Sequence, residues 1–333
     1  MKNVIVTGAN GHIGYQLCRQ LVDRGYKVRA MVRDVATRDY SLLKKLDVEL
    51  VEGDCLKPES LVAVMHDMDG LFHLAAIFDN SIDEIDAIVK PNIEISENVL
   101  RAAKHAGISR IIYTSSIAAI GTAKRGSAPL GIDVYNDQST QLYARSKALS
   151  EQHAWALATE LNLNMATVLP ASVIGPSHHE PTDSIEMIDQ IMKGKVPFAV
   201  PVHFGFVDVR DVAMAHILVF ESALNSRNVA MAFDGDSKFI IQQLKKIRKV
   251  NASEFVLPLW FCKILPLFDW VTHKLTGSKR LITTSTVEEY FGKQQKYSDR
   301  VLIDQLGWQT FSAEDTIKAT VESLENNREH RSV

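Results

Sequence analysis

The stretch VIVTGANGHIGYQLCRQL, residues 4–21, decides the fold, because an apolar run leads directly into three glycines and then into a helical pattern. The run VIV predicts a short strand that is buried on both faces. From Ile13 onward, apolar side chains recur at the spacing of a helix that packs on one face. The three glycines therefore lie in a strand-to-helix turn.

This turn suits a phosphate group. Backbone N–H groups at the start of a helix lack intrahelical partners, and the helix dipole adds partial positive charge there. Gly8 allows the sharp turn, Gly11 lets a ligand approach the backbone, and Gly14 lets the helix pack closely on the strand. The spacing G-x-x-G-x-x-G differs from the dinucleotide fingerprint G-x-G-x-x-G, and such a turn also serves simply to join a strand to a helix. From the motif alone, both interpretations stay open.

The composition describes a globular protein without a strong charge bias. Its 333 residues, of which 46% are hydrophobic, suffice for a full core, and the formal net charge of -3 gives no long-range attraction to nucleic acid. The three cysteines have no metal-ligand spacing and cannot all be paired, and the N-terminus shows no signal-peptide pattern. We therefore expect a cytoplasmic protein that does not bind nucleic acid.

Strand and helix patterns alternate through the first half of the chain. Further strands are expected over residues 26–33, 48–54, 70–76, 110–116 and 164–175. This alternation predicts an α/β fold with a doubly wound parallel sheet, of the Rossmann type, whose ligands lie at the carboxyl ends of the strands.

The regular alternation stops near residue 175. We expect a nucleotide-binding domain over residues 1–175, and a smaller C-terminal substrate-binding lobe that occupies most of 176–333. Residues 206–235, with a helical pattern and one further strand, are expected to return to the main sheet.

The apolar stretch FVLPLWFCKILPLFDW, residues 255–270, resembles the beginning of a membrane segment. It has only 16 residues, with two prolines and a lysine among them, whereas about 20 apolar residues are needed to cross a bilayer. No transmembrane span is expected. We interpret the stretch as a buried or substrate-facing helix of the smaller lobe, with a peripheral membrane contact as the alternative.

A second group with catalytic potential is the segment YARSK. Tyr143 and Lys147 are four residues apart in a helical pattern, so their side chains share one face. A nearby ammonium group favours the phenolate and is expected to lower the tyrosine pKa from about 10, which makes the phenol a usable acid or base. The same spacing also arises by chance in an ordinary amphipathic helix.

Eight motifs in order give the sequence a wider resemblance: TGANGHIG (7–14), VRD (32–34), GDCLK (53–57), HLAA (73–76), YTSSIAAIG (113–121), YARSK (143–147), LPASVIGP (169–176) and FVDVRDVA (206–213). Together they resemble the extended short-chain dehydrogenase/reductase family, the NAD-dependent epimerase/dehydratase superfamily, and in particular its dihydroflavonol-reductase-like branch. In that family the three-glycine turn has the spacing found in this sequence.

The resemblance implies a role for each matching residue. Tyr143 is the general acid/base at the substrate oxygen, Lys147 lowers its pKa and holds the nicotinamide ribose, and Ser116, rather than Ser115, hydrogen-bonds the same oxygen. The cofactor-binding residues that it implies are Gly8, Asn10, Gly11, His12, Ile13, Gly14, Arg33, Asp54, Cys55, Leu74, Ala75, Ala76, Thr114, Tyr143, Lys147, Pro170, Ala171, Ser172 and Val173.

Two positions bear on the choice of cofactor. Relatives that prefer NAD usually end their second strand with an Asp, and the matching residue in this sequence is Val32, followed by Arg33. A guanidinium group can bind a 2'-phosphate through two hydrogen bonds, so NADPH (NADP) is expected, with NAD possible. Asp34 complicates this, because it could pair with Arg33 or turn to the ribose.

Other residues carry weaker signals. The triplet at 178–180, HHE, has no third ligand at a useful spacing, so no metal site is expected. The substrate residues expected are Phe78, His203, Phe204 and Phe206, of which the last three could equally belong to the core.

The leading hypothesis is an enzyme, an NADPH-dependent reductase of a ketone or aldehyde with apolar surface, working reversibly as an alcohol dehydrogenase. A nucleotide-sugar epimerase or dehydratase with tightly bound NAD is the alternative, for which Lys193, Lys195 and Arg210 could bind the diphosphate. A third hypothesis is a regulator that senses the cofactor and does not catalyse a reaction. The partner is expected to be a small carbonyl compound, and the protein a monomer or a homodimer.

Overall fold

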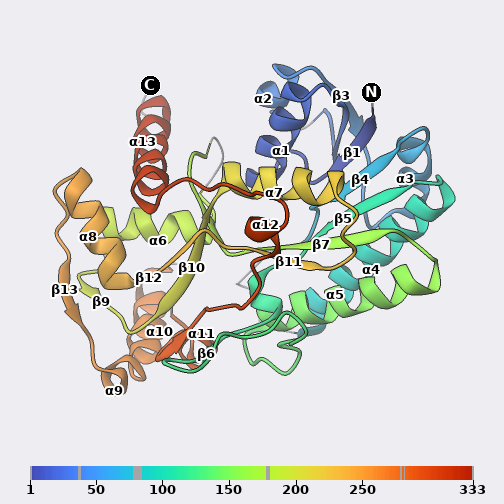
Figure 1. Ribbon diagram of the computed structural model, residues 1–333. Coiled ribbons are helices and arrows are strands. Elements are labelled where there is room, and N and C mark those ends of the chain that lie inside the picture. The colour runs from blue at the N-terminus through green and yellow to red at the C-terminus, as the bar shows by residue number, and fades with distance from the viewer. Residues whose placement is uncertain are drawn as a thin grey trace.

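The computed structural model describes residues 2–36, 39–77, 85–177, 181–277, 280 and 282–331. Its centre is a parallel sheet of seven strands in the order β11-β7-β5-β4-β1-β2-β3 (Figure 1). In this order the strands are β11 (Arg227–Ala230), β7 (Met165–Pro170), β5 (Arg110–Thr114), β4 (Gly70–His73), β1 (Asn3–Thr7), β2 (Lys27–Val32) and β3 (Val48–Glu52). The predicted doubly wound α/β fold is confirmed.

Helices cover both faces of this sheet (Figure 1). One face packs against α1 (His12–Asp23) and α7 (Val209–Glu221), which contact each other. The other face packs against α3 (Pro58–Met65), α4 (Ile85–His105) and α5 (Leu142–Glu160). Because both faces are covered, the central strands carry apolar residues on each face, which is why they appear in the sequence as continuous apolar runs.

The strand order reverses direction at β1. The chain proceeds from β1 to β2 and β3 on one side, then crosses to β4 and continues to β5, β7 and β11 on the other side. A crevice forms at the carboxyl ends of the strands where such an order reverses, and ligands of doubly wound sheets bind there. The ends of β1 and β4 therefore mark the expected ligand site.

The smaller lobe contains short sheets and six helices in the described part of the chain. One sheet has the order β12-β10-β8, and two strand pairs, β13 with β9 and β14 with β6, complete it. The strands are β6 (Ala123–Lys124), β8 (Ser172–Ile174), β9 (Phe198–Ala199), β10 (His203–Asp208), β12 (Phe233–Asp236), β13 (Ser253–Val256) and β14 (Lys293–Gln294). The helices are α6 (Asp183–Met192), α8 (Ser237–Ile247), α9 (Leu259–Cys262), α10 (Leu265–Thr276), α11 (Thr284–Tyr290) and α13 (Ala313–Arg331).

Three short helical segments lie outside these two groups. They are α2 (Ser41–Lys44), the 3-10 turn Ile117–Ala119, and α12 (Val301–Asp304), which contacts α7 and β11.

Two predicted elements differ in detail from the structure. The run predicted as one strand over 164–175 divides into β7 in the main sheet and β8 in the lobe, because the chain leaves the main sheet after Pro170. Of the segment 206–235, β11 pairs with β7 in the main sheet, whereas β10 and β12 pair with each other in the lobe. The division of the chain at residue 175 stays a prediction.

The interpretation of residues 255–270 as one buried helix is wrong, whereas a substrate-facing role stays a prediction. The stretch forms the end of β13, the short helix α9 and the first half of α10, and most of its large apolar side chains are exposed. Within it, only Cys262 and Pro266 are buried. The apolar composition therefore does not reflect burial in the lobe. None of the helices in the described ranges combines the length and the apolarity that a bilayer crossing requires.

Candidate active site

The glycine turn joins β1 to α1, with a different local reason for each glycine. Gly8 has a φ of +69°, a conformation that other residues rarely adopt, and a Cβ at Gly14 would lie 2.2 Å from the Gly8 carbonyl oxygen. Around Gly11, by contrast, a Cβ would meet only that same oxygen within 4 Å. Gly11 also caps α1 without a side-chain hydrogen bond. The backbone at Gly11 is therefore open to a ligand at the N-terminus of α1.

A side-chain hydrogen bond joins the ends of β1 and β4 beside this turn. The Thr7 hydroxyl lies 2.8 Å from His73 Nδ1 and accepts hydrogen bonds from the backbone N–H groups of Leu74 and Ala75. Burial lowers the pKa of His73 to about 3, so its imidazole is neutral and Nδ1 can accept from the hydroxyl. This arrangement fixes the segment of small residues, Ala75 and Ala76, that follows β4.

The end of β2 places Arg33 at the surface. Val32 is buried, whereas Arg33 is exposed and has no hydrogen-bond or ion-pair partner among the described residues. Asp34 turns back on its own chain, since its Oδ1 accepts from the Ala36 N–H at 2.8 Å. After β3, Asp54 accepts from the Leu56 N–H through Oδ1 at 3.0 Å. The guanidinium group of Arg33 is thus available for a ligand at this edge of the sheet.

The two serines after β5 have different surroundings. Ser115 is buried and donates to Glu151 Oε2 at 2.8 Å. Ser116 accepts from the Ala118 N–H at 3.1 Å, and its hydroxyl lies close enough to the Tyr143 phenol to lower the pKa of that phenol. Of the two, Ser116 is therefore the one placed beside the predicted acid.

The phenol of Tyr143 lies in a desolvated setting. Burial raises its pKa above the ordinary value, the hydrogen bond with Ser116 opposes this, and the charge of Asp183 adds to the rise. The predicted fall of this pKa below its ordinary value is therefore wrong, because the cost of removing a phenolate from water dominates.

Lys147 is itself buried. Burial lowers the pKa of its ammonium group to about 8, against which the charge of Glu151 acts. Its Nζ donates to the Thr114 carbonyl at 3.4 Å, and the Thr114 hydroxyl in turn lies 2.8 Å from His216 Nε2. Thr114 therefore connects the predicted catalytic helix α5 to α7, across the end of β5.

Sequence reasoning missed the ion pair next to Lys147. Glu151, one turn further along α5, is fully buried, and Arg227 from β11 donates to both of its carboxylate oxygens at 2.8 and 2.9 Å. Arg227 also donates to the carbonyls of Ile132 and Val134. The partners are 76 residues apart in sequence, and their spacing carries no signal of the pair.

A second group that sequence reasoning missed is the carboxylate of Glu289 on α11. It is buried and accepts hydrogen bonds from Asn136 and Ser139 at 3.0 and 2.7 Å. Ser139 Oγ accepts from the Gln141 N–H, and Gln141 caps the first turn of α5 through the Ala144 N–H. The smaller lobe thus holds the start of the helix that carries Tyr143.

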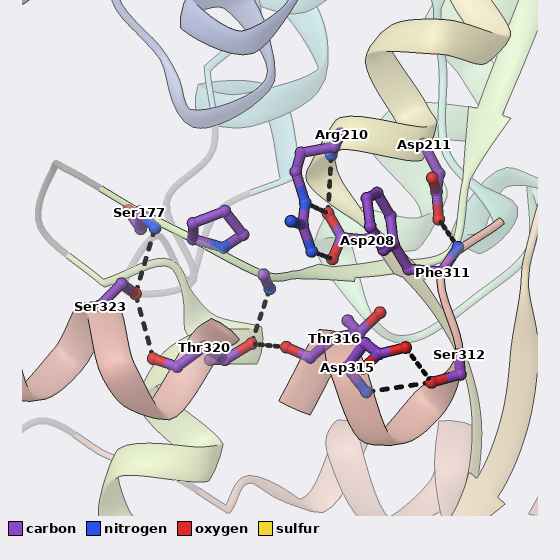
Figure 2. A network of polar contacts seen from close by, with 12 residues as sticks. Ser177, Asp208, Arg210, Asp211, Phe311, Ser312, Asp315, Thr316, Thr320 and Ser323 are labelled. Atoms are coloured by element: carbon purple, nitrogen blue, oxygen red, sulfur yellow. Dashed lines mark hydrogen bonds and ion pairs between the residues drawn. The ribbon is translucent and has the colours of Figure 1, made fainter. Parts of the chain in front are cut away.

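The segment after β7 also depends on the smaller lobe. Among the predicted cofactor residues in it, Pro170 and Ala171 are buried, whereas Ser172 and Val173 are partly exposed. Further along, hydroxyl groups of α13 accept from backbone N–H groups, Thr320 from Gly175 and Ser323 from Ser177 (Figure 2). The C-terminal helix therefore fixes the chain where it leaves the main sheet.

The predicted substrate residues differ in their placement. Phe204 lies edge-on to the ring of Tyr290. Burial raises the pKa of Tyr290, and the nearby charge of Tyr143 adds to this rise. His203 pairs with Asp234 at 2.9 Å. Phe206 is fully buried between sheet and helices of the lobe, so it belongs to the core rather than to a pocket.

Two predictions concern residues outside the described ranges. These residues are Phe78 and the HHE triplet at 178–180. In the described part of the chain, no group of three or more His, Cys, Asp or Glu side chains is arranged to hold a metal ion.

Comparison with known proteins assigns the family. The model of the NAD dependent epimerase/dehydratase family matches residues 4–231, which include the main sheet except for Asn3. The chain belongs to this family. It is an NAD(P)-dependent oxidoreductase.

Its relatives in this family include named reductases. A protein of Synechocystis whose name assigns it provisionally as a dihydroflavonol 4-reductase is 32% identical over 81% of this chain and 78% of its own length. The cinnamoyl-CoA reductase CAD2 of Medicago truncatula is 35% identical over 66% of this chain and 72% of its own. The crystal structure of Gre2 from Candida albicans in complex with NADPH has a TM-score of 0.73 and 26% identity, and covers 98% of this chain and 99% of that one.

The residues of this chain fit a dinucleotide. The open backbone at Gly11 and the positive end of α1 suit the pyrophosphate, and small residues follow β4 and β7, where a ligand of this kind approaches the backbone closely. Arg33 and Asp54 stand at the side of the sheet where the adenosine of such a ligand lies.

Proposed function

We propose that the protein is an NADPH-dependent reductase of a ketone or aldehyde that has substantial apolar surface. The observation that carries the proposal is the placement of the Ser116 hydroxyl beside the Tyr143 phenol, close enough to lower its pKa, at the carboxyl end of β5, with Lys147 one helical turn along α5. A hydroxyl pair of this kind beside a cofactor site can bind one carbonyl oxygen from two directions.

The roles of the three side chains follow from their surroundings. NADPH, when bound, supplies the hydride that adds to the carbonyl carbon. Ser116 donates a hydrogen bond to the carbonyl oxygen as negative charge develops on it, and Tyr143 gives that oxygen its phenolic proton, so that the carbonyl becomes an alcohol. Lys147 binds the ribose and stabilises the phenolate that remains.

The raised pKa of Tyr143 is consistent with a phenol that acts as a proton donor. A phenol whose pKa lies above its ordinary value is fully protonated at neutral pH, and it therefore enters the reaction as a proton donor. Oxidation of an alcohol needs the phenolate, which becomes more abundant as the pH rises. The ratio of reduction to oxidation should accordingly fall with increasing pH.

NADPH is preferred to NADH in this proposal because of Arg33. Its exposed guanidinium group lies at the end of β2 and has no partner among the described residues. The preceding residue is Val32, so no carboxylate stands at that position. Asp34 is directed to the Ala36 N–H. A 2'-phosphate would therefore meet an available cation at this edge.

The alternative, a nucleotide-sugar epimerase or dehydratase, needs cations for a diphosphate in the smaller lobe. Two of the three candidate cations already have carboxylate partners. Lys193 pairs with Asp189, and Arg210 donates to Asp208 through two nitrogens at 2.9 and 2.7 Å while its guanidinium stacks on Phe311 (Figure 2). Lys195 alone is a weak basis for a diphosphate site.

The aromatic side chains near Tyr143 favour an apolar substrate instead. Phe204 and Tyr290 pack against each other at a centroid distance of 5.4 Å, and both are only partly buried. A pocket gains about 25 cal/mol for each Å² of apolar surface removed from water, so an aromatic or long aliphatic carbonyl compound can bind without charge pairing. The reductase names of the relatives agree with such a substrate.

A direct comparison of substrates tests the proposal. Aromatic and aliphatic aldehydes and ketones, dihydroflavonols and cinnamoyl-CoA are assayed for NADPH oxidation, and UDP- and dTDP-sugars for epimerisation or dehydration with NAD. We expect turnover of at least one carbonyl compound and of no nucleotide sugar. The reverse result would replace the proposal by its alternative.

A further inference from the structure

Large apolar side chains gather on the surface of one part of the smaller lobe. Of the 15 that are exposed in the described part of the chain, nine lie between Phe255 and Leu275. They form the α9–α10 patch, which consists of Phe255, Leu259, Trp260, Ile264, Leu267, Phe268, Trp270, Val271 and Leu275. Trp260 is 69% exposed and Leu275 80%, so these are not side chains that merely border the core.

Helix α10 turns its apolar side outward. Leu267, Val271 and Leu275 recur every four residues along one exposed stripe. Asp269, by contrast, is largely buried and pairs with Arg280 at 3.2 Å, and Arg280 also donates to the Pro266 carbonyl. A helix on the surface of a globular protein normally has the opposite arrangement, with its apolar side on the core. Such an inverted helix needs an apolar environment outside the protein.

The chemistry of the α9–α10 patch indicates which environment this is. Two tryptophans and two phenylalanines stand among aliphatic residues, and exposed Lys263 and Lys274 accompany them. Asp269 is the only acidic residue between Phe255 and Gly277, and its charge is compensated by Arg280. The patch is therefore basic, although the whole chain has a formal net charge of -3.

We propose that the α9–α10 patch docks the protein on the surface of an anionic lipid bilayer. Tryptophan and phenylalanine side chains enter the boundary between headgroups and acyl chains, while lysines at the edge of such a surface meet anionic headgroups. Helix α10 would lie in the plane of the membrane, with Leu267, Val271 and Leu275 toward the acyl chains. Docking of this kind requires no helix that crosses the bilayer.

The inner side of α9 connects this patch to the candidate active site. Buried Cys262 of α9 packs in one cluster with Val202, and partly buried Phe204 and Tyr290 pack against the same cluster. The wall that carries Phe204 and Tyr290 is thus backed by the segment that faces the membrane. The docking itself does not depend on the proposed reaction.

Flotation with lipid vesicles tests the proposal on the purified full-length chain. The probes are vesicles of phosphatidylcholine alone and of phosphatidylcholine mixed with phosphatidylglycerol. We expect the protein to float with the mixed vesicles, and its tryptophan emission to shift to shorter wavelength as Trp260 and Trp270 leave water. Trp308 is buried and should not contribute to that shift.

Two variants separate the apolar and the electrostatic contributions. Trp260→Gln combined with Phe268→Gln should reduce binding on the order of tenfold or more, because two large exposed side chains no longer enter the lipid. Lys263→Glu combined with Lys274→Glu should abolish the preference for phosphatidylglycerol. Val62→Gln combined with Ile303→Gln, at exposed apolar positions on α3 and α12, is the matched control and should bind as the wild type does.

The outcomes decide the proposal irrespective of catalysis. Thermal unfolding of each variant shows that the fold is kept, which is expected because every replaced side chain is exposed. Absence of flotation by the wild type, or equal flotation by the Trp260/Phe268 variant, overturns the proposal. So does sedimentation that shows a wild-type dimer and a monomeric Trp260/Phe268 variant, since a second copy of the chain would then cover the patch.

Discussion

Replacement of Glu151 by glutamine should both destabilise the protein and change its pH dependence. The substitution keeps the shape of the side chain but removes the charge that faces Arg227, whose guanidinium is also buried. Loss of one partner from a buried ion pair costs about 3–5 kcal/mol, because the remaining charge stays desolvated and uncompensated. We therefore expect a loss of this size in the free energy of unfolding, measured with urea.

A double-mutant cycle with Arg227→Met makes the reasoning quantitative. Each single variant leaves one buried charge, so simple addition of the two losses predicts about 6–10 kcal/mol. The double variant contains neither charge and loses mainly the two hydrogen bonds from Arg227 to the carbonyls of Ile132 and Val134, at about 1 kcal/mol each. Its loss should thus be only about 2 kcal/mol. Additive losses in the double variant would refute the ion-pair argument.

The same variants report on Lys147. Glu151 opposes the effect of burial on the Lys147 ammonium, whose pKa is about 8. Without that charge the pKa falls further, so a reaction that needs charged Lys147 should lose activity at a lower pH than in the wild type. The shift should appear in the alkaline limb of kcat/KM in both Glu151→Gln and the double variant, even though the double variant regains stability. An unchanged alkaline limb would show that Lys147 does not act through its charge.

Three further substitutions test the site. Arg33→Ala should weaken NADPH binding by about 1.5–3 kcal/mol, which is roughly ten- to a hundredfold, and leave NADH binding nearly unchanged; equal losses in calorimetric titrations would contradict its assignment to the 2'-phosphate. Tyr143→Phe should reduce turnover by about a hundred- to ten-thousand-fold with cofactor affinity kept, and near-normal steady-state rates would exclude it as the proton donor. Lys147→Met should weaken cofactor binding yet stabilise the apoprotein by up to about 3 kcal/mol at pH 7, because burial lowers the lysine pKa from 10.5 to about 8. Between these two pKa values the folded protein binds fewer protons than the unfolded chain. The stability gained in the Lys147→Met variant should therefore be full below pH 8 and lost by pH 10.5. A gain that does not depend on pH in urea titrations would refute this prediction.

Local sequence pattern was sufficient for the main sheet and for the glycine turn. The runs that form β1, β4 and β5 are apolar on both sides because the sheet is covered on both faces, and this requirement is visible in each run by itself. Gly8 and Gly14 are likewise set by backbone geometry within a few residues of each other. The spacing of Tyr143 and Lys147 on one helix indicated a shared face for the same local reason.

Tertiary structure decided the burial, the pKa and the charge partners of these side chains. The pKa of Tyr143 rises rather than falls, since desolvation depends on what covers the side chain and not on its neighbour four residues away. The pair Glu151–Arg227 and the carboxylate of Glu289 hold α5 through partners that lie 76 to 153 residues away in sequence. The apolar stretch over 255–270 was interpreted as buried because composition does not state which side of a helix meets the protein. Local pattern therefore determined the elements and their order, whereas burial, charge pairing and the direction of each face were fixed only when distant segments packed together.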